Sequence, residues 1–427
     1  MTISSRFSKT RIISWCMFDF ASTIFMMNIV SLAFVQWLDH KFGNGDSKYA
    51  IISAIMYGLS IILYPFAGRI CDQGWKLIPL FLLTMISVTG TFFIGFSQNI
   101  WQAGCFFILA YLTYQLALTY YNALLNDITS PEHFGKISGY GVAARYLGTI
   151  VGLFSIDYFI QTAKHSSLPG FLHFLLLKID PTKKALYVNA FIPTALMYFL
   201  FTIPLFIIFF LTRAGKQEKP SVVHDRTLLE SLKDTLQDRS TRFLLLTLFF
   251  GGMPVYASIH FMSVILKKIG DVPDGKVIGF LIFATIFSIL GGLLFGFALR
   301  KVGNKKIFNL VMLLWTAIFA FGIFIHGNAI MWPLVMLAGT AMGGYWVSAR
   351  VLVLDLAPKG KEGEYMALFG AVIVVCGLGC MLLWWLGVAW ATSWGFSFTP
   401  QRMSMLLLAL AGIIGIFTFI PVRFPKT

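Results

Sequence analysis

The chain has 427 residues, of which 58% are hydrophobic and 12% charged, whereas a typical soluble domain carries about 25% charged residues. Apolar runs of about 20 residues, each long enough to cross a hydrocarbon core of about 30 Å, recur along nearly the whole sequence. These features exclude a soluble globular protein and predict an all-α integral membrane protein. The net charge of +15 would fit a nucleic-acid partner, but membrane topology explains it better, so we expect none.

Twelve apolar spans are expected along the chain, in two sets of six. The first set lies near residues 12–38, 49–67, 77–97, 101–125, 137–160 and 185–212. The second set lies near residues 243–266, 277–299, 307–326, 330–354, 365–391 and 403–421. A charged stretch from Arg213 to Arg242 separates the two sets. We therefore expect an N-terminal six-helix bundle (1–212), a cytoplasmic linker (213–242) and a C-terminal six-helix bundle (243–427).

Lys and Arg residues are distributed unevenly between the loops. With both termini on one side of the membrane, that side holds 21 of the 33 Lys and Arg residues, the other side holds ten, and two lie within spans. Because cytoplasmic loops are richer in Lys and Arg, we expect both termini in the cytoplasm, at the plasma (inner) membrane if the protein is bacterial. The excess positive charge is then mainly a topological signal.

The two sets of spans resemble each other at a constant offset of 228 residues. The stretches "GRICDQGWK" at Gly68 and "GFALRKVGNKK" at Gly296 each follow the second span of a set. Asp127 and Asp355 each end the fourth span of a set. Two anchors with one offset favour a duplication into two pseudo-symmetric bundles, an arrangement in which substrate sites lie between the halves near the membrane midplane.

The loop after the second span resembles the signature of the major facilitator superfamily, Gly-x-x-x-Asp-Arg/Lys-x-Gly-x-Arg/Lys-Arg/Lys. The first copy matches with an altered middle, and the second copy has Arg300 where the acidic residue should stand. The resemblance implies a twelve-helix transporter fold in which this loop latches the cytoplasmic side. The residues it assigns to the latch are Gly68, Asp72, Lys76, Gly296, Arg300 and Lys305.

Three further stretches resemble the vacuole-effluxer branch of that superfamily, whose members include fungal vacuolar amino-acid exporters and many bacterial proteins. They are "SWCMFDFAST" in the first span, "YYNALLNDITSPEHFGKISGYGVAARYLG" in the fourth and fifth, and "VSARVLVLDLAPKGKEGEYMALFG" in the tenth and eleventh. The resemblance implies amino acids as the first substrate class. Arg145 stands where we would expect a small or apolar residue, and it adds a charge to the cavity.

The first span carries an acidic residue deep within apolar sequence. Asp19 lies eight residues past Arg11, about 12 Å along a helix, and a charge at that depth costs at least a few kcal/mol. Trp15, Asp19 and Ser22 share one helical stripe. Because the first helix of this fold normally faces the central cavity, we expect Asp19 to bind a proton or a substrate amine. The alternative is a structural pairing with a neighbouring helix.

The fifth span carries a basic residue at a similar depth. Arg145 lies nine residues past Lys136, about 13 Å along a helix. It interrupts a stripe of small residues that would allow close helix approach, namely Ser138, Gly141, Gly148 and Gly152. Since the first and fifth helices are neighbours in this fold, we expect an Asp19–Arg145 pair. The pair is either static or opened by substrate or proton.

Polar residues also form stripes in the fourth and tenth spans. The stripe of the fourth span consists of Gln115, Thr119, Asn122 and Asn126, and we expect it to line the cavity rather than to bond across helices. The stripe of the tenth span consists of Gly339, Gly343, Trp346 and Arg350. Arg350 offers a bidentate donor for a carboxylate or phosphate, unless it reaches the cytoplasmic surface near Asp355.

A histidine lies in the seventh span, four residues after Tyr256. His260 could relay protons near physiological pH, or it could be a structural hydrogen-bonding group. Gly251, Gly252 and Pro254 precede it and predict a weakened helix, as in discontinuous transporter helices.

Motifs for catalysis and cofactor binding are absent from the sequence. The five cysteines are scattered, and Cys376 and Cys380 lack a further Cys or His that would complete a metal site. A glycine-rich phosphate loop ending in Lys-Ser/Thr is also missing. We therefore expect no metal, no cofactor and no enzymatic activity.

These features together predict a secondary transporter that works by alternating access. We expect it to move a small polar solute with an anionic group, amino-acid-like, with H+ as the coupling ion and a monomer in the lipid bilayer as the working form. Arg145 and Arg350 would recognise the anion, and Asp19 would serve a proton or an amine. The alternatives are a larger organic substrate such as a siderophore or a drug, a transporter-like receptor or assembly factor that does not transport, and a membrane-embedded enzyme.

Overall fold

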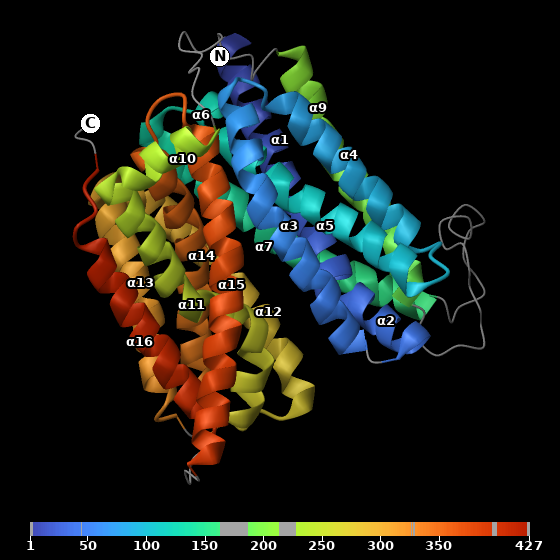
Figure 1. Cartoon of the computed structure of the whole chain (residues 1–427), viewed down its shortest axis with the longest axis vertical. Helices are drawn as coiled ribbons and strands as arrows, with labels where there is room; N and C mark the ends of the chain where they lie inside the picture. The colour runs from blue at the N-terminus through green and yellow to red at the C-terminus, as the bar shows by residue number, and fades with distance from the viewer. Residues whose placement is uncertain are drawn as a thin grey trace. The chain divides into compact units, whose positions relative to one another are not determined.

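The computed structural model describes residues 3–43, 45–162, 187–212, 228–325, 327, 329–394 and 399–424, and all regular structure in them is helical (Figure 1). Eleven helical stretches among these residues are long and apolar enough to cross a membrane. The predicted fifth span lies in α7 (Phe134–Thr162), a 29-residue helix that is not one of the eleven. Arg145 and the glycines of α7 dilute its apolar side chains, so the expected twelve spans are reached only when this helix is included.

The first compact unit, called unit 1, comprises Met1–Ile128 and Ala144–Ser221. Its helices are α1 (Ile3–Phe25), η1 (Met26–Ala33), α2 (Phe34–Phe42), α3 (Gly45–Asp72), α4 (Leu77–Ile94), α5 (Ile100–Ala123), α6 (Leu125–Ile128), most of α7, η3 (Tyr187–Ala190) and α9 (Phe191–Leu211). Within it α5 packs against α3 and α4, and α1 packs against α9. Aromatic rings fill its core, as in the stack of Phe34 on Phe107, whose centroids are 3.9 Å apart.

The first membrane helix changes its winding along its length. Between α1 and α2 the chain forms η1, a π-helix, a rare form that leaves backbone carbonyl groups for neighbours to bind. The hydroxyl of Tyr49 donates to the Val30 carbonyl oxygen at 3.0 Å. The buried Nδ2 of Asn28 donates to Ser155 Oγ at 3.2 Å and to Thr194 Oγ1 at 3.1 Å. These bonds tie η1 to α3, α7 and α9, and no pattern in the sequence predicted them.

The second compact unit, called unit 2, comprises Thr129–Ala143 and Val222–Thr427. Its helices are η2 (Pro131–His133), the first residues of α7, α10 (Leu228–Gln237), α11 (Arg239–Lys268), α12 (Asp274–Val302), α13 (Asn304–Gly322), α14 (Met331–Leu356), α15 (Glu362–Ser393) and α16 (Gln401–Phe419). Within it α12 packs against α14, and α11, α15 and α16 pack against one another. Of the expected linker, residues 213–227 lie outside the described ranges, and the rest form α10 and the start of α11.

Small residues allow close helix contacts in both units. A Cβ added at Gly148 of α7 would lie 2.3 Å from the carbonyl oxygen of Phe20, so the small-residue stripe of the fifth span packs against α1, as the sequence predicted. A Cβ added at Gly343 of α14 would lie 2.2 Å from the carbonyl oxygen of Ser288 on α12. In contrast, α11 continues without a break through Pro254, where the sequence predicted a weakened helix.

A Gly148→Ala substitution is expected to lower the melting temperature of the protein in detergent, because the added methyl group would overlap the backbone of α1. Overpacking of this kind costs about 1–3 kcal/mol. The control is Gly377→Ala, since nothing lies within 4 Å of a Cβ added at Gly377. Equal melting temperatures for the two variants in thermal denaturation would contradict the close contact between α1 and α7.

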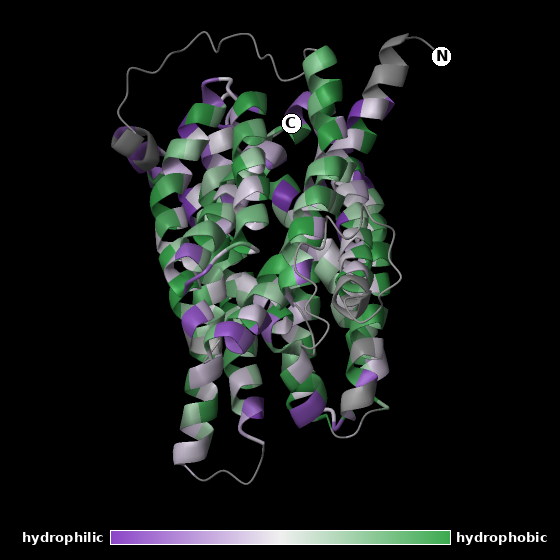
Figure 2. Ribbon diagram, turned by 90° about the vertical axis from the view of Figure 1, so that its right-hand side faces the viewer, coloured by the Kyte–Doolittle hydropathy of each residue, from purple (hydrophilic) through white to green (hydrophobic). Residues whose placement is uncertain are grey.

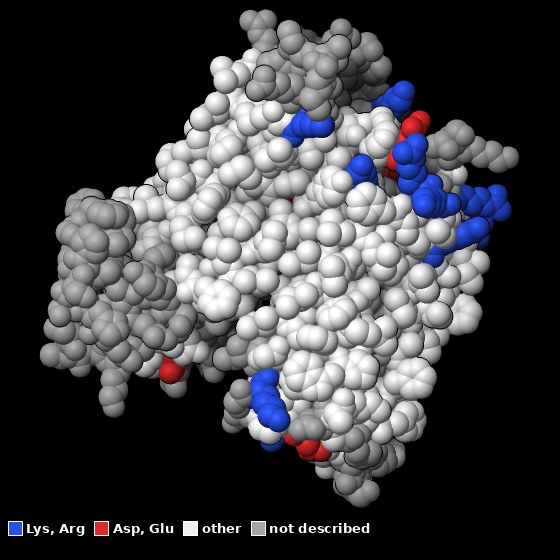
Figure 3. Space-filling model, turned by 180° about the vertical axis from the view of Figure 1, so that it is seen from behind, with Lys and Arg blue, Asp and Glu red and all other residues white. Residues whose placement is uncertain are grey.

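Apolar side chains cover much of the outer surface. Ile62, Leu200 and Leu382 are each more than half exposed. Figure 2 shows long hydrophobic stretches along the helices of both units. Charged side chains on the face drawn in Figure 3 gather in a few clusters, and uncharged side chains cover the expanse between them. Such a surface is suited to contact with lipid, where an exposed charge is costly.

Candidate functional site

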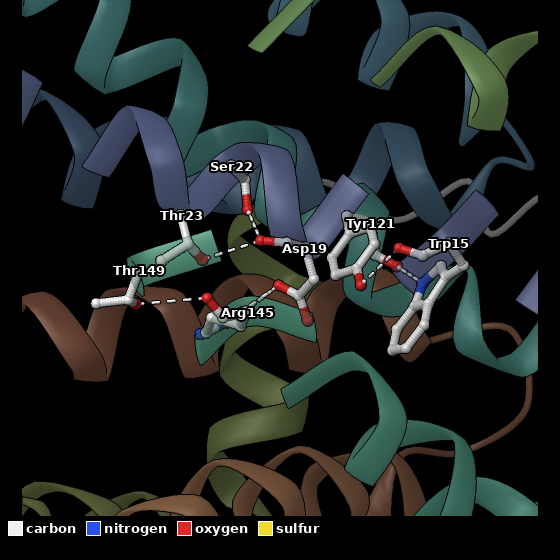
Figure 4. Close-up of polar contacts among 7 residues, drawn as sticks. All are labelled: Trp15, Asp19, Ser22, Thr23, Tyr121, Arg145 and Thr149. Carbon is white, nitrogen blue, oxygen red and sulfur yellow. Dashed lines mark hydrogen bonds and ion pairs between the residues drawn. The ribbon is translucent and has the colours of Figure 1, made fainter. Parts of the chain in front are cut away.

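The acidic residue of the first span forms a buried ion pair. Arg145 on α7 points at Asp19 on α1, with its Nη2 at 2.6 Å and its Nε at 3.1 Å from Asp19 Oδ1 (Figure 4). The side chain of Asp19 is fully buried, and that of Arg145 is 17% exposed. The pair expected from the sequence is therefore present. Each charge lowers the cost of burying the other, since a lone charge at this place would be strongly destabilising.

The hydroxyl groups next to the pair bond to the helix backbone. Ser22 Oγ and Thr23 Oγ1 both donate to the carbonyl oxygen of Asp19, at 3.0 Å and 2.9 Å. Thr149 donates to the carbonyl oxygen of Arg145 at 3.4 Å. Figure 4 shows these bonds on either side of the pair. Ser22, a predicted site residue, thus lies one turn from Asp19 with its hydrogen directed along the helix.

Trp15, the third member of the predicted stripe, packs against α5. Its Nε1 donates to the carbonyl oxygen of Tyr121, and the hydroxyl of Tyr121 donates to the carbonyl oxygen of Trp15, both at 3.1 Å. The two rings stack with centroids 4.7 Å apart (Figure 4). Trp15 is fully buried, so the structure places it in the contact between helices beside the ion pair. Sequence reasoning missed Tyr121, because no local pattern marks its partner 106 residues away.

The polar stripe of the fourth span lies on α5. Gln115 and Thr119 are buried, and Asn122 is half-buried. Neither Thr119 Oγ1 nor Asn122 Oδ1 has a hydrogen-bond partner among the residues that the structure describes. Because buried polar atoms are normally paired, these two atoms mark a face of α5 on which a bound molecule would supply the partner.

The predicted residues of the seventh and tenth spans lie on α11 and α14 of unit 2. The rings of Tyr256 and Trp346 meet edge to face, with centroids 5.9 Å apart. Arg350, one turn after Trp346, is only 3% exposed, so its guanidinium group is buried rather than held at a surface. His260, one turn after Tyr256, is exposed and meets the ring of Phe261 edge-on at 6.4 Å. The aromatic pair and Arg350 therefore form the polar–aromatic part of unit 2.

The predicted latch contains one buried ion pair. Lys76, directly before α4, is 2% exposed, and its Nζ lies 2.9 Å from Oδ1 and 3.2 Å from Oδ2 of Asp127 on α6. In the second half Asn304 Nδ2 donates to Asp355 Oδ2. Each partner in the second contact lies 228 residues after its equivalent in the first. The repeat inferred from the sequence therefore extends to bonds, because each half ties the start of its third span to the end of its fourth.

The other predicted latch residues differ in their surroundings. The structure buries Gly68 and Gly296, leaves Asp72 half-buried and exposes Arg300 and Lys305. The Nζ of Lys305 donates to a backbone carbonyl oxygen near the end of the chain at 2.6 Å. The sequence analysis did not name the acidic partners of the latch, although the common offset of the two aspartates was the signal for them.

No group of three or more His, Cys, Asp or Glu side chains is placed to hold a metal ion in the part of the chain that the structure describes. The five cysteines are free thiols. One of them, Cys376, donates from Sγ to the carbonyl oxygen of Phe249 at 3.2 Å. The candidate groups are thus the ion pair and the α5 stripe in unit 1, and the aromatic pair with Arg350 in unit 2.

The fold is similar to that of several solved transporters. A bacterial homologue of the iron transporter ferroportin, in an outward-facing state, aligns with a TM-score of 0.71 and 12% identity over 96% of this chain and 99% of that chain. The proton:xylose symporter XylE aligns with a TM-score of 0.66 and 14% identity over 98% and 96% of the two chains. The E. coli fucose:proton symporter FucP aligns with a TM-score of 0.69 and 13% identity over 95% and 98%. These similarities establish the major facilitator fold.

Sequence comparison identifies the family within that fold. An uncharacterised protein of Aquifex aeolicus (strain VF5) is 22% identical over 428 residues, covering 96% of each chain. The model of the family described as "Vacuole effluxer Atg22 like" matches residues 126–383, which is more than half of the chain and includes Arg145 and Arg350. The protein is therefore a transporter of the major facilitator superfamily and not an enzyme, and it belongs to the vacuole effluxer Atg22-like family.

Proposed function

We propose that this transporter moves a small amino-acid-like solute that carries an anionic group, together with a proton. The observation that carries the proposal is the buried Asp19–Arg145 ion pair. A buried ion pair is a weak stabilising device compared with apolar packing, whereas ionisable groups within membrane spans often mark substrate and proton pathways. The solved neighbours XylE and FucP, both described as proton symporters, support proton coupling by analogy.

The pair suggests a mechanism in which charge stays compensated at every step. The guanidinium of Arg145 binds the Asp19 carboxylate in the resting state. When substrate arrives, its carboxylate takes over the bidentate donor group of Arg145. Asp19, now without its partner, takes up a proton, because an unpaired buried carboxylate is costly. Substrate and proton are then bound together and leave together, with Arg145 returning to Asp19.

Unit 2 offers a second group for recognition. Arg350 is buried one turn from Trp346, whose ring meets that of Tyr256. A buried guanidinium beside aromatic rings suits a solute with one anionic end and an apolar body. We include Arg350 as an anion-binding residue and the two rings as contacts for the substrate side chain.

The test is transport by the purified protein in proteoliposomes. We expect at least one of the twenty standard L-amino acids to cross the membrane faster under an imposed pH gradient, with proton movement reported by a trapped pH dye. Asp19→Asn cannot take up a proton, so it should keep substrate exchange and lose the response to the gradient. Asp39→Asn, an exposed acid at the end of α2, is the control and should behave like wild type.

Two results would contradict the proposal in different ways. A full response to the pH gradient in Asp19→Asn would remove the proton role of Asp19. An absence of flux for all twenty amino acids, with flux for a siderophore or a drug, would overturn the substrate class and leave the transporter fold in place.

A further inference from the structure

Threonines within the helices of this protein commonly turn their hydroxyl group back to the backbone. Thr23, Thr84, Thr113 and Thr202 each donate to the carbonyl oxygen four residues earlier, at 2.9, 2.7, 2.7 and 2.8 Å. This bond satisfies a buried hydroxyl without help from another helix. Thr119 on α5 is just as deeply buried, at 2% exposure, yet its Oγ1 has no partner in the described part of the chain.

Thr194 shows what a buried threonine hydroxyl does when another group needs it. Its Oγ1 accepts a hydrogen bond from the amide of Asn28 at 3.1 Å, across the contact between η1 and α9. The hydroxyl of Thr119 is in the same position without the incoming donor. A buried hydroxyl that forgoes the available backbone bond is oriented for a partner outside the described residues.

A second unpaired acceptor lies one turn along the same face of α5. Asn122 follows Thr119 by three residues, and both belong to the stripe that contains Gln115. The Oδ1 of Asn122 is buried and has no partner among the residues described. A different side of α5 is fixed in place by the two bonds between Tyr121 and Trp15. The two acceptors are therefore held on a helix whose position is well defined.

We propose that Thr119 and Asn122 bind the amino group of the substrate. An amide carbonyl oxygen accepts hydrogen bonds and a hydroxyl oxygen accepts them readily, so the missing partner is a molecule with N–H or O–H donors. An ammonium group brings three donors, of which these two atoms would accept one each. Asp19 is already neutralised by Arg145 in this structure, so the amine needs other acceptors. The assignment rests on the proposed amino-acid transport, and it gives the amine to Thr119 and Asn122 and leaves the proton to Asp19.

The test compares ligands that differ only in the amino group. The L-amino acid that binds best in a thermal-shift screen of all twenty is paired with its des-amino acid and with its decarboxylated amine. For leucine these are 4-methylpentanoate and 3-methylbutylamine. We expect Thr119→Val and Asn122→Leu each to weaken binding of the amino acid and of the amine about tenfold, since each removes one hydrogen bond to a charged group. Binding of the des-amino acid should stay within twofold of wild type.

A matched control lies on the same helix. Thr113→Val makes the same chemical change at a threonine whose hydroxyl is already bonded to the backbone at 2.7 Å, so all three affinities should be unchanged. Asn122→Asp adds a carboxylate at the subsite and should strengthen binding of the amine. This gain cannot come from a damaged fold, and its absence would count against the subsite.

The outcomes separate the subsite from the proposed function. If wild type binds amino acids but Thr119→Val and Asn122→Leu weaken the amino acid and the des-amino acid equally, the two residues are structural and the subsite is wrong. If wild type neither binds nor transports any amino acid, the proposed function is wrong and the subsite falls with it.

Discussion

Arg145→Met is expected to abolish transport and to lower the free energy of unfolding by about 3–5 kcal/mol, the usual cost of leaving one member of a buried pair alone. The lone group would be Asp19, which is fully buried and loses the donors that lie 2.6 Å and 3.1 Å from its Oδ1. Denaturation in detergent measures the stability, and flux in proteoliposomes measures the activity.

The double variant Asp19→Leu with Arg145→Met separates the structural and functional roles of the pair. Removing both charges leaves no buried charge, so most of the lost stability should return. Transport should remain absent, because the groups assigned to the proton and the anion are gone. Wild-type flux in the double variant would show that the pair is structural only.

An exposed pair provides the control for these measurements. Lys361 and Glu364 lie 3.7 Å apart at the start of α15, with the lysine side chain 24% exposed. Lys361→Met should cost less than about 1 kcal/mol, because solvent screens such pairs. A cost equal to that of Arg145→Met would mean that burial does not set the energy of the Asp19–Arg145 pair.

Arg350→Gln is expected to weaken binding of anionic substrates about 10- to 100-fold, the range for losing hydrogen bonds between charged groups. The loss should be confined to ligands with a free carboxylate, so the amide of the same amino acid should bind both proteins equally. Isothermal titration calorimetry on the purified protein gives these affinities.

The matched control for Arg350→Gln is Arg300→Gln, which removes an exposed guanidinium group at the end of α12. This variant should bind both ligands like wild type. If Arg350→Gln also binds the carboxylate ligand like wild type, the buried guanidinium does not recognise the anion.

The repeated latch illustrates how far a sequence pattern can reach. The equal offset of Gly68 to Gly296 and of Asp127 to Asp355 predicted a duplication. The structure adds that Asp127 pairs with Lys76, whereas Asp355 accepts from Asn304. A duplicated fold keeps the geometry of such a contact, while its charge is free to diverge, and only the coordinates show which residues meet.

The sequence by itself determined the membrane helices, because about 20 apolar residues in a row are required to cross the bilayer. It also predicted the Asp19–Arg145 pair, because two opposite charges at equal depth on neighbouring helices are costly unless they meet. Only the tertiary structure decided which way each helix face turns. It directed Trp15 to Tyr121, buried Arg350, and left Thr119 and Asn122 without partners in the described chain. Helix rotation and side-chain rotamers are set by packing between residues far apart in sequence, and a local pattern carries no record of that packing.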